Sequence, residues 1–155
     1  MKSATPTGCT NLKLKQASRL VSRHYDAHLA PTGLLKTQYS LLSFVVKMGP
    51  VRCIDLAAAM QLDASTTTRN LQPLAARGLL QLSPGADARS RLVQATGAGV
   101  ALREQAQKAW KRAQLALNAQ LGAARVAALH HVLDGCIADL SNIAPSSPPR
   151  RMEAP

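Results

Sequence analysis

The first third of the chain carries apolar side chains at three- and four-residue steps, the pattern of helices with one buried face. The first such stretch covers about residues 11–30 and stops at the helix-breaking segment Pro31–Gly33. Apolar positions within Tyr39–Val46 predict a second helix, which Gly49–Pro50 closes. We therefore expect two amphipathic helices before residue 51.

Two shorter helices follow, joined by a link of a few residues. The segment Ile54–Met60 is a run of apolar, helix-favouring residues. Asp63 can cap the next helix by accepting backbone N–H bonds, and Gly78 is suited to end that helix, after Arg77, in a left-handed conformation. Two short helices with a tight link predict a helix-turn-helix.

Two short segments, Leu79–Ser83 and Ser90–Ala95, come next, and a turn with proline, glycine and charged residues separates them. This pattern predicts a β-hairpin. Thr96 then caps a long helix with an apolar stripe, which Gly122 interrupts before a second stripe begins. The first stripe contains Leu102, Ala106, Ala109, Trp110, Ala113, Leu117 and Leu121, and the second contains Val126, Leu129, Leu133, Cys136, Ile137 and Leu140.

This order of elements predicts a mainly α-helical fold with a small β-hairpin wing, namely a winged helix-turn-helix with long N- and C-terminal dimerisation helices. The flanking helices carry more apolar surface than so small a winged unit can cover, so we expect them to pack against a second copy in a homodimer. The expected parts are a flexible tail (1–10), an N-terminal dimerisation helix (11–34), the winged helix-turn-helix (35–95), the C-terminal dimerisation helices (96–143) and a disordered tail (144–155).

Composition and charge narrow the possible partners. Apolar residues make up 46% of the chain but aromatic residues only 3%, so the core must consist of Ala, Leu and Val, which favours helices. The formal net charge of +11 indicates attraction to a polyanion, nucleic acid first and an anionic membrane second. The sequence contains neither a run of about 18 apolar residues nor a secretory signal at its start, so we expect a cytoplasmic protein with no membrane partner.

The cysteines and histidines suggest no metal site. Cys9, Cys53 and Cys136 are odd in number and far apart, which argues against a disulfide framework and against a zinc knuckle. Cys136 lies on an apolar stripe, so we expect it to be buried and inert. His24 and His28 are one helical turn apart, but the sequence offers no third ligand, and we expect neither a metal nor another cofactor.

Five segments, in this order and spacing, resemble the MarR (multiple antibiotic resistance regulator) family over roughly residues 11–143. They are Gln38–Leu42, Asp55–Ala57, Ser65–Arg69, Leu74–Leu80 and Asp87–Ser90. The resemblance implies a triangular dimer in which the first and the last two helices of each subunit interlock. It also implies a repressor-like regulator whose DNA affinity is changed by a small aromatic or phenolic molecule, or by thiol oxidation.

We expect the recognition helix and the wing to bind double-stranded DNA at an inverted repeat. Small polar residues allow a helix to enter the major groove, and Arg69 can contact a guanine or a phosphate. Arg89 can enter the minor groove while Asp87 orients its guanidinium, a pair that the resemblance identifies as the family's wing signature. The candidate DNA-binding residues are Ser65, Thr66, Thr67, Thr68, Arg69, Asn70, Asp87, Arg89 and Arg91.

Two simpler interpretations of these residues remain open. The Ser-Thr-Thr-Thr run can be only a helix-capping cluster, and a charged hairpin tip can be only a solvated turn. Pro73 lies inside the recognition helix, removes one backbone N–H bond and predicts a local bend.

Two sensing chemistries also remain open. By resemblance, an aromatic ligand would bind between the dimerisation helices and the winged domain, where Tyr25, His28 and Tyr39 are candidate lining residues, although core packing explains the tyrosines equally well. Cys9 lies close to the place of the reactive thiol in the family's organic-hydroperoxide-sensing branch. When the shared segment around Arg19 is aligned, however, Cys9 falls about two residues too early.

The principal hypothesis is a sequence-specific regulator rather than an enzyme. An architectural DNA-binding protein with weak sequence preference is the first alternative, because phosphate contacts alone can hold a basic protein on DNA. A thiol-dependent enzyme using Cys9 is the second, and no acid–base group near that cysteine supports it.

Overall fold

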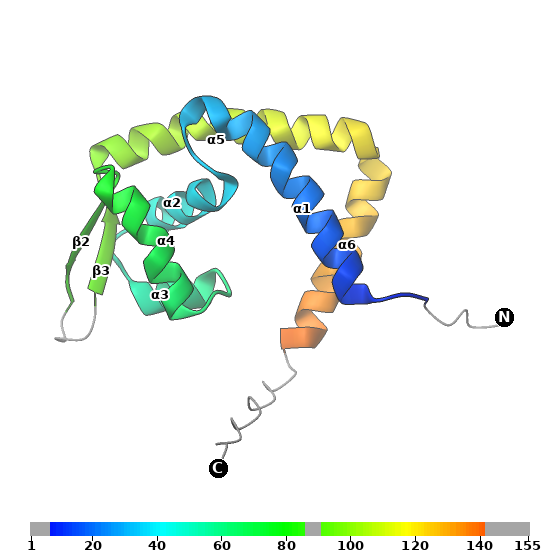
Figure 1. Ribbon diagram of the computed structural model, residues 1–155, viewed down its shortest axis with the longest axis horizontal. Helices are drawn as coiled ribbons and strands as arrows, with labels where there is room; N and C mark the ends of the chain where they lie inside the picture. Colours follow the sequence, from blue (N-terminus) through cyan, green and yellow to red (C-terminus); the bar gives the residue numbers. More distant parts are fainter. Residues whose placement is uncertain (1–6, 86–90, 142–155) are drawn as a thin grey trace, which may run out of the picture. The chain divides into compact units, whose positions relative to one another are not determined.

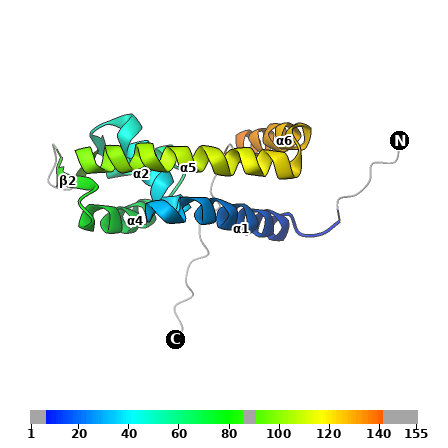
Figure 2. The ribbon, with the colours of Figure 1, turned by 90° about the horizontal axis from the view of Figure 1, so that it is seen from above.

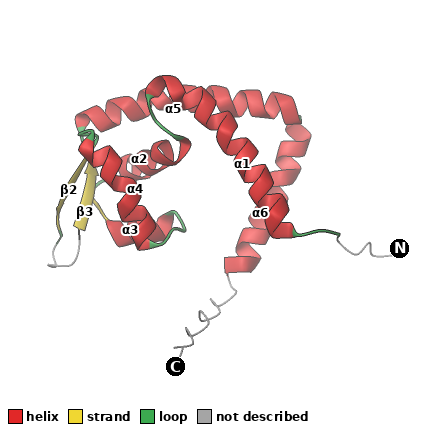
Figure 3. Cartoon of the chain, viewed as in Figure 1, coloured by secondary structure: helices red, strands yellow, loops and turns green. Residues whose placement is uncertain are grey.

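The computed structural model describes residues 7–85 and 91–141, and it divides into a first unit that ends at Leu115 and a second unit that begins at Ala116. Helices make up most of the described chain, and the strands lie together beside α4 (Figure 1, Figure 3). The elements are α1 (Thr10–Leu29), η1 (Ala30–Thr32), α2 (Lys36–Met48), β1 (Val51–Arg52), α3 (Cys53–Ala59), α4 (Ala64–Ala76), β2 (Leu80–Pro84), β3 (Arg91–Ala95), α5 (Gly97–Leu121) and α6 (Ala123–Ser141).

The helices begin and end close to the residues that the pattern predicts, because the predicted helix-breaking glycines lie at the observed helix ends. Gly33, Gly78 and Gly122 adopt positive φ values of 68°, 70° and 84°, the left-handed region that glycine enters without a steric cost. Thr96 caps α5 as predicted, since its Oγ1 accepts a hydrogen bond from the Gly99 backbone N–H at 3.1 Å. Of the predicted tails, residues 1–6 of the first (1–10) and the whole of the second (144–155) lie outside the described residues, and Thr10 already belongs to α1.

The wing is a three-stranded antiparallel sheet with the order β1-β3-β2. In β2 and β3, Leu80 lies opposite Ala95 and Pro84 lies opposite Arg91. The sequence pattern does not predict the first strand, β1. This strand places Val51 opposite Val93, so that a third strand pairs with the hairpin on its α3 side.

The first unit has a core of its own, centred on α2. Leu42 and Val45 of α2 are fully buried, as are Leu56 of α3 and Leu74 of α4. Seen from above, the first half of α5 passes over α2 (Figure 2), and Ala106 and Ala109 of α5 pack in one core with Leu42 of α2. The helix-turn-helix, the sheet and α5 therefore share one core, whose members are Leu29, Leu34, Tyr39, Leu41, Leu42, Val45, Val51, Leu56, Leu71, Leu74, Leu79, Leu80, Val93, Ala106 and Ala109.

One glycine permits this close packing. A Cβ placed on Gly99 would lie 2.1 Å from the backbone oxygen of Leu79 and 3.4 Å from Leu42 Cδ1. No side chain fits at the first distance, so the start of α5 can approach the junction between α4 and β2 only because residue 99 is glycine.

The second unit, described for residues 116–141, contains the end of α5 and the whole of α6. Val126 is buried, whereas the apolar side chains further along α6 are largely exposed, with Leu129 at 45% and Leu140 at 59%. The prediction that Cys136 is buried is wrong, because its side chain is exposed on this helix. None of the helices in residues 7–85 and 91–141 combines the length and the apolar character needed to cross a membrane.

Candidate nucleic-acid interface

The second helix of the helix-turn-helix, α4, begins at a strong N-cap. Asp63 Oδ1 accepts hydrogen bonds from the Thr66 backbone N–H at 2.7 Å and from Ser65 Oγ at 2.6 Å, while Thr66 Oγ1 donates to Asp63 Oδ2 at 2.6 Å. These donors stabilise the charged form and hold the pKa of the Asp63 carboxyl well below its usual range. The predicted capping by Asp63 is confirmed, and the carboxylate is ionised at neutral pH.

The predicted DNA-binding residues of α4 lie on different sides of the helix. Ser65, Thr68 and Arg69 are exposed, whereas Asn70 is only partly accessible. Thr67 is fully buried and its Oγ1 donates to the Asp63 carbonyl oxygen at 3.0 Å. Thr67 therefore belongs to the core, and its expected role at the DNA surface is corrected, because its hydroxyl cannot reach a base while α4 stays packed.

The far end of α4 is tied to the segment after α1. Arg77 Nη1 donates to the Gly33 carbonyl oxygen at 2.9 Å. At the same end, the Leu79 backbone N–H donates to the Leu74 carbonyl oxygen at 3.0 Å, which closes the helix beyond the left-handed Gly78. Pro73 lies within α4, and the helix continues through it to Ala76. The bond between Arg77 and Gly33 ties the end of α4 to the segment after α1, and no local pattern predicts it.

Only the base of the wing is described. Asp87 and Arg89, the predicted residues of its tip, lie outside the described residues. Arg91 is exposed at the start of β3, and its charge lowers the pKa of the Cys53 thiol, partly offsetting the larger rise that burial causes. Arg91 therefore lies close to the start of α3. Arg52 of β1 forms an exposed ion pair with Asp55 at 2.6 Å in the same region.

The candidate effector residues belong to an aromatic cluster between α1, α2 and α5. Tyr25 and Tyr39 are buried, and Trp110 lies 6.1 Å from the Tyr25 ring and 6.4 Å from the Tyr39 ring, between ring centroids. Burial raises the pKa of the Tyr25 hydroxyl, which donates a hydrogen bond to Gln114 Oε1. His28 contacts the cluster only through His24, whose ring centroid lies 4.6 Å from that of His28 and 5.8 Å from that of Tyr25. The His28 Nδ1 atom lies 2.9 Å from the His24 carbonyl oxygen.

A small hollow of about 190 Å³ opens beside this cluster, entirely within the first unit. Its lining combines one cationic side chain, three serine hydroxyl groups and two aromatic side chains, contributed by Ser18, Val21, Ser22, Tyr25, Lys36, Ser40 and Trp110. Tyr25 is the one member of the predicted ligand-binding set among these lining residues, and His28 and Tyr39 are not among them.

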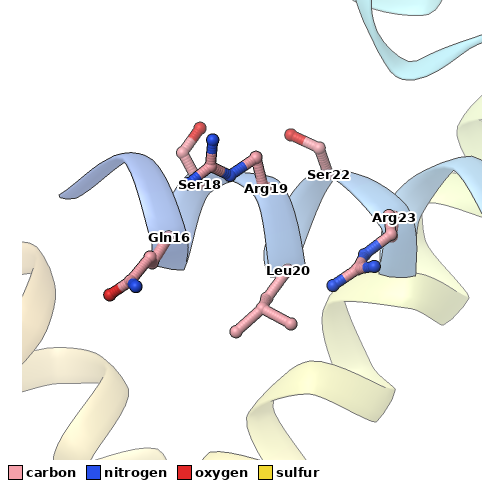
Figure 4. A pocket seen from close by; sticks show the side chains of 6 residues that line it. All are labelled: Gln16, Ser18, Arg19, Leu20, Ser22 and Arg23. Atoms are coloured by element: carbon pink, nitrogen blue, oxygen red, sulfur yellow. The ribbon is translucent and has the colours of Figure 1, made fainter. Parts of the chain in front are cut away.

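A larger hollow of about 660 Å³ runs along α1 and is open to solvent. Figure 4 shows that Leu20 and Ser22 point to opposite sides of the helix, so the labelled side chains surround α1 rather than enclose a ligand. Leu20 is 60% exposed and Leu12 is 52% exposed on the same helix.

The candidate thiol and histidine sites have simple surroundings. Cys9 is exposed and is the N-cap residue of α1, without a side-chain capping bond. His24 Nε2 lies 2.8 Å from the Ala113 carbonyl oxygen, so His24 and His28 each pair with a backbone carbonyl. In the part of the chain that the structure describes, no cluster of three His, Cys, Asp or Glu side chains could hold a metal ion.

Comparisons with known proteins agree with this geometry. The sequence model of the MarR family matches residues 32–90, which include the helix-turn-helix and the hairpin tip. The chain is also similar to a DNA complex of the Mycobacterium tuberculosis transcriptional regulator MosR, with 29% identity, a TM-score of 0.68 and coverage of 83% of this chain and 98% of that one. Residues 32–90 of this chain, which carry its helix-turn-helix, match the MarR family, and the chain shares the MarR-like fold.

Two further relatives support the same conclusion. A mutant Escherichia coli MarR in complex with operator DNA has the same fold, with 22% identity, a TM-score of 0.75 and coverage of 82% of this chain and 92% of that one. YwoH, an uncharacterized HTH-type transcriptional regulator of Bacillus subtilis, is 30% identical over 81 residues, 52% of this chain and 59% of YwoH. The match thus spans little more than half of that curated relative.

The shared fold confirms the predicted winged helix-turn-helix. The match to the MarR family model and to the regulators MosR and YwoH agrees with the prediction that the chain is a transcription regulator rather than an enzyme. Two of the similar structures, MosR and the mutant MarR, are complexes with DNA.

Proposed function

We propose that this chain is a sequence-specific DNA-binding regulator in which α4 enters the major groove and the wing contacts the adjoining minor groove. The observation that carries the proposal is the solvent face of α4, where Arg69 is exposed opposite the buried side chains of Thr67 and Leu71. A formal net charge of +11 adds a sequence-independent attraction to the DNA phosphates. Arg69 would then supply the first direct base contact.

The proposed regulator acts as a homodimer. Leu12 and Leu20 of α1, and Leu129, Ile137 and Leu140 of α6, are between 45% and 60% exposed in the single chain. Burying apolar surface contributes a favourable free energy of about 25 cal/mol per Å². Helices with this many exposed apolar side chains therefore favour association. A two-fold dimer would bind an inverted repeat whose half-site centres are about one DNA turn, roughly 10 base pairs, apart.

The wing completes each half-site. Arg89 enters the minor groove, where the negative potential is concentrated, and Asp87 holds its guanidinium in place. The exposed Arg91, at the base of β3, contacts a phosphate. The support for the Asp87–Arg89 pair is the sequence and the family resemblance, while the support for Arg91 includes its exposure.

The effector is a small aromatic acid that binds in the 190 Å³ hollow between α1, α2 and α5. The Lys36 ammonium would pair with the carboxylate, and Trp110 offers an aromatic surface. Lys36, which lines the hollow, donates a hydrogen bond from its backbone N–H to Asp26 of α1 at 2.6 Å. A ligand in the hollow would therefore change the packing at the junction between α1 and α2. Because α2 packs on α4, a shift at that junction changes the placement of the recognition helix.

A binding titration with a matched control tests the DNA proposal. Arg69→Ala should lose about 1–3 kcal/mol on the selected operator and relax discrimination at one base pair. The control, Arg112→Ala, removes the same charge from an exposed position on α5 and should change affinity only through net charge. Equal affinity of the wild type for operator and random DNA over a salt series would instead indicate an architectural protein.

The effector proposal has its own test. A series of substituted benzoic acids should weaken operator binding by the wild type but not by Lys36→Gln, with Lys111→Gln as the control at an exposed position of α5. Thiol oxidation at the exposed Cys9 is the competing mechanism. It would be favoured if hydrogen peroxide releases the operator, Cys9→Ser prevents the release, and the acids have no effect.

A further inference from the structure

The recognition helix leaves only a few side chains free to contact bases. Successive residues of an α-helix are about 100° apart, so the face of α4 opposite its buried residues Thr67, Leu71 and Leu74 is the one that can lie in a groove. The exposed residues near the middle of that face are Ser65, Arg69, Gln72, Pro73 and Ala76.

The hydroxyl groups at the start of α4 already donate their protons in hydrogen bonds within the helix and its cap. Ser65 and Thr66 donate to the ionised Asp63 carboxylate, each at 2.6 Å, and Thr68 Oγ1 donates to the Ala64 carbonyl oxygen at 2.9 Å. A hydroxyl has a single proton, so these groups remain acceptors only. Phosphate oxygens and the guanine O6 and N7 atoms are acceptors too, and these hydroxyls cannot bind them without breaking an existing bond.

Arg69 and Gln72 differ from these residues. Within residues 7–85 and 91–141, neither side chain takes part in a hydrogen bond or an ion pair. They are three residues apart, which places them on neighbouring parts of one face and about 4.5 Å apart along the helix axis. This rise is close to the step of about 3.4 Å between base pairs. Two free, long polar side chains therefore project together from the middle of the exposed face.

The residues around them keep this part of the helix narrow. Pro73 and Ala76 flank Gln72 on the same face and are exposed, and neither carries a polar side chain that could compete for a base edge. Pro73 also has no backbone N–H. The middle of α4 can thus approach the floor of the groove while Arg69 and Gln72 reach beyond it.

We propose that Gln72 determines sequence specificity by recognising one adenine in each half-site, next to the base pair that Arg69 contacts. The carboxamide accepts from adenine N6 and donates to adenine N7, a bidentate match that a hydroxyl cannot make. This proposal rests on the proposed function, since it requires α4 to lie in the major groove. It adds a second base-recognising residue, beyond the polar run at the start of the helix.

The test is selection of bound sequences from randomised DNA, followed by titration on the selected site and on its single-base variants. Wild-type protein should select a half-site containing an adenine, and replacing that adenine should weaken binding roughly 5- to 150-fold. Gln72→Ala should abolish the adenine preference while the other positions keep theirs. The control, Gln105→Ala, makes the same change at an exposed position on α5 and should select the wild-type site.

A second variant tests whether the hydrogen-bonding groups of residue 72 determine which base is preferred. Gln72→Glu replaces the donor with an acceptor, so the preference at the same position should move from adenine to cytosine, whose N4 group donates. Both variants should melt like wild type, because residue 72 is exposed.

Two results would overturn the proposal, and they are distinguishable. If the wild type selects a defined site and Gln72→Ala selects the same site with the same adenine preference, Gln72 does not recognise a base, although the regulator proposal stands. If the wild type selects no site at all, the regulator proposal fails as well.

Discussion

The first unit of the structure, which ends at Leu115 and is here called the winged unit, contrasts with the helix α6. Both show helical apolar periodicity, but the burial of their apolar residues is opposite. In the winged unit, Leu42, Leu56 and Leu74 have 0% of their surface exposed, whereas Leu129 and Leu140 of α6 are 45% and 59% exposed. Both sets lie on the apolar faces of amphipathic helices, so composition does not explain the difference. The difference shows that periodicity identifies the face that must be covered but not the chain that covers it.

Truncating a leucine in each region should give the largest contrast in stability. Leu42→Ala should lower the free energy of unfolding by about 2–5 kcal/mol, because it removes a fully buried side chain from the core of the winged unit. Leu140→Ala, the same change at a 59% exposed position, should cost the winged unit no more than about 0.5 kcal/mol.

Denaturant unfolding followed by the fluorescence of Trp110 measures this contrast, since the only tryptophan of the chain lies in the winged unit. Equal losses in the two variants would contradict the division into a self-sufficient unit and a helix that awaits a partner.

A charge on the apolar face of α6 should act on assembly instead. Leu133→Asp should convert the proposed dimer to monomers or unfold it, because association would bury an unpaired carboxylate. His131→Asp introduces the same charge on the opposite side of α6 and should leave the dimer intact.

Light scattering at micromolar concentration measures this result. A wild-type monomer, or a Leu133→Asp variant that remains a dimer, would show that the exposed face of α6 has another purpose.

The elements that the sequence predicts correctly are those with a local signal. The helix ends follow from glycines, prolines and capping residues, and the Asp63 cap and the Gly78 terminus both occupy the predicted positions. Such features depend on φ preferences and on bonds between residues a few positions apart, so a single sequence contains them.

The errors concern features that depend on distant residues. β1 has only two residues, too few to show alternation, and it exists because Val51 pairs with Val93. Thr67 stands in a run of polar residues but faces Leu71 and Leu74 on the buried side of α4, which only the register of the helix reveals. The sequence pattern also does not identify Gln72 as a candidate, because this residue lies beyond the polar run and only the register of the helix places it on the exposed face.

Removing a charge from the wing should reduce DNA binding without a comparable loss of stability. Arg89→Ala should weaken operator affinity and reduce the magnitude of the slope of log affinity against log salt by about 0.9 for each phosphate-equivalent interaction that the substitution removes. The two wings of a dimer should double the change. Asp87→Ala should have a smaller effect, because Arg89 keeps its charge but loses its orientation.

Affinities at several salt concentrations, with thermal melts of the same samples, test this prediction. Wild-type affinity in Arg89→Ala would mean that the wing is not part of the interface. A variant that fails only because it melts early would mean that Arg89 is structural.

The smallest expected effect concerns the cap of α4, which belongs to the winged unit and should not depend on assembly. The bonds to Asp63 lower the pKa of its carboxyl in the folded state below the ordinary value of 3.8. The unfolded chain therefore binds more protons than the folded chain as the pH falls past about 4. The stabilisation by the charged cap is complete above that pH and is lost as the pH approaches the lowered pKa of the folded state.

Asp63→Asn keeps an acceptor for the Thr66 backbone N–H but has no charge to titrate. The melting temperature of wild type should thus exceed that of Asp63→Asn near pH 7, and the difference should shrink as the pH drops from about 4 toward about 2, while the other carboxyl groups affect both proteins alike. A difference that stays constant over this range, or widens, would show that the ionised carboxylate does not stabilise the helix.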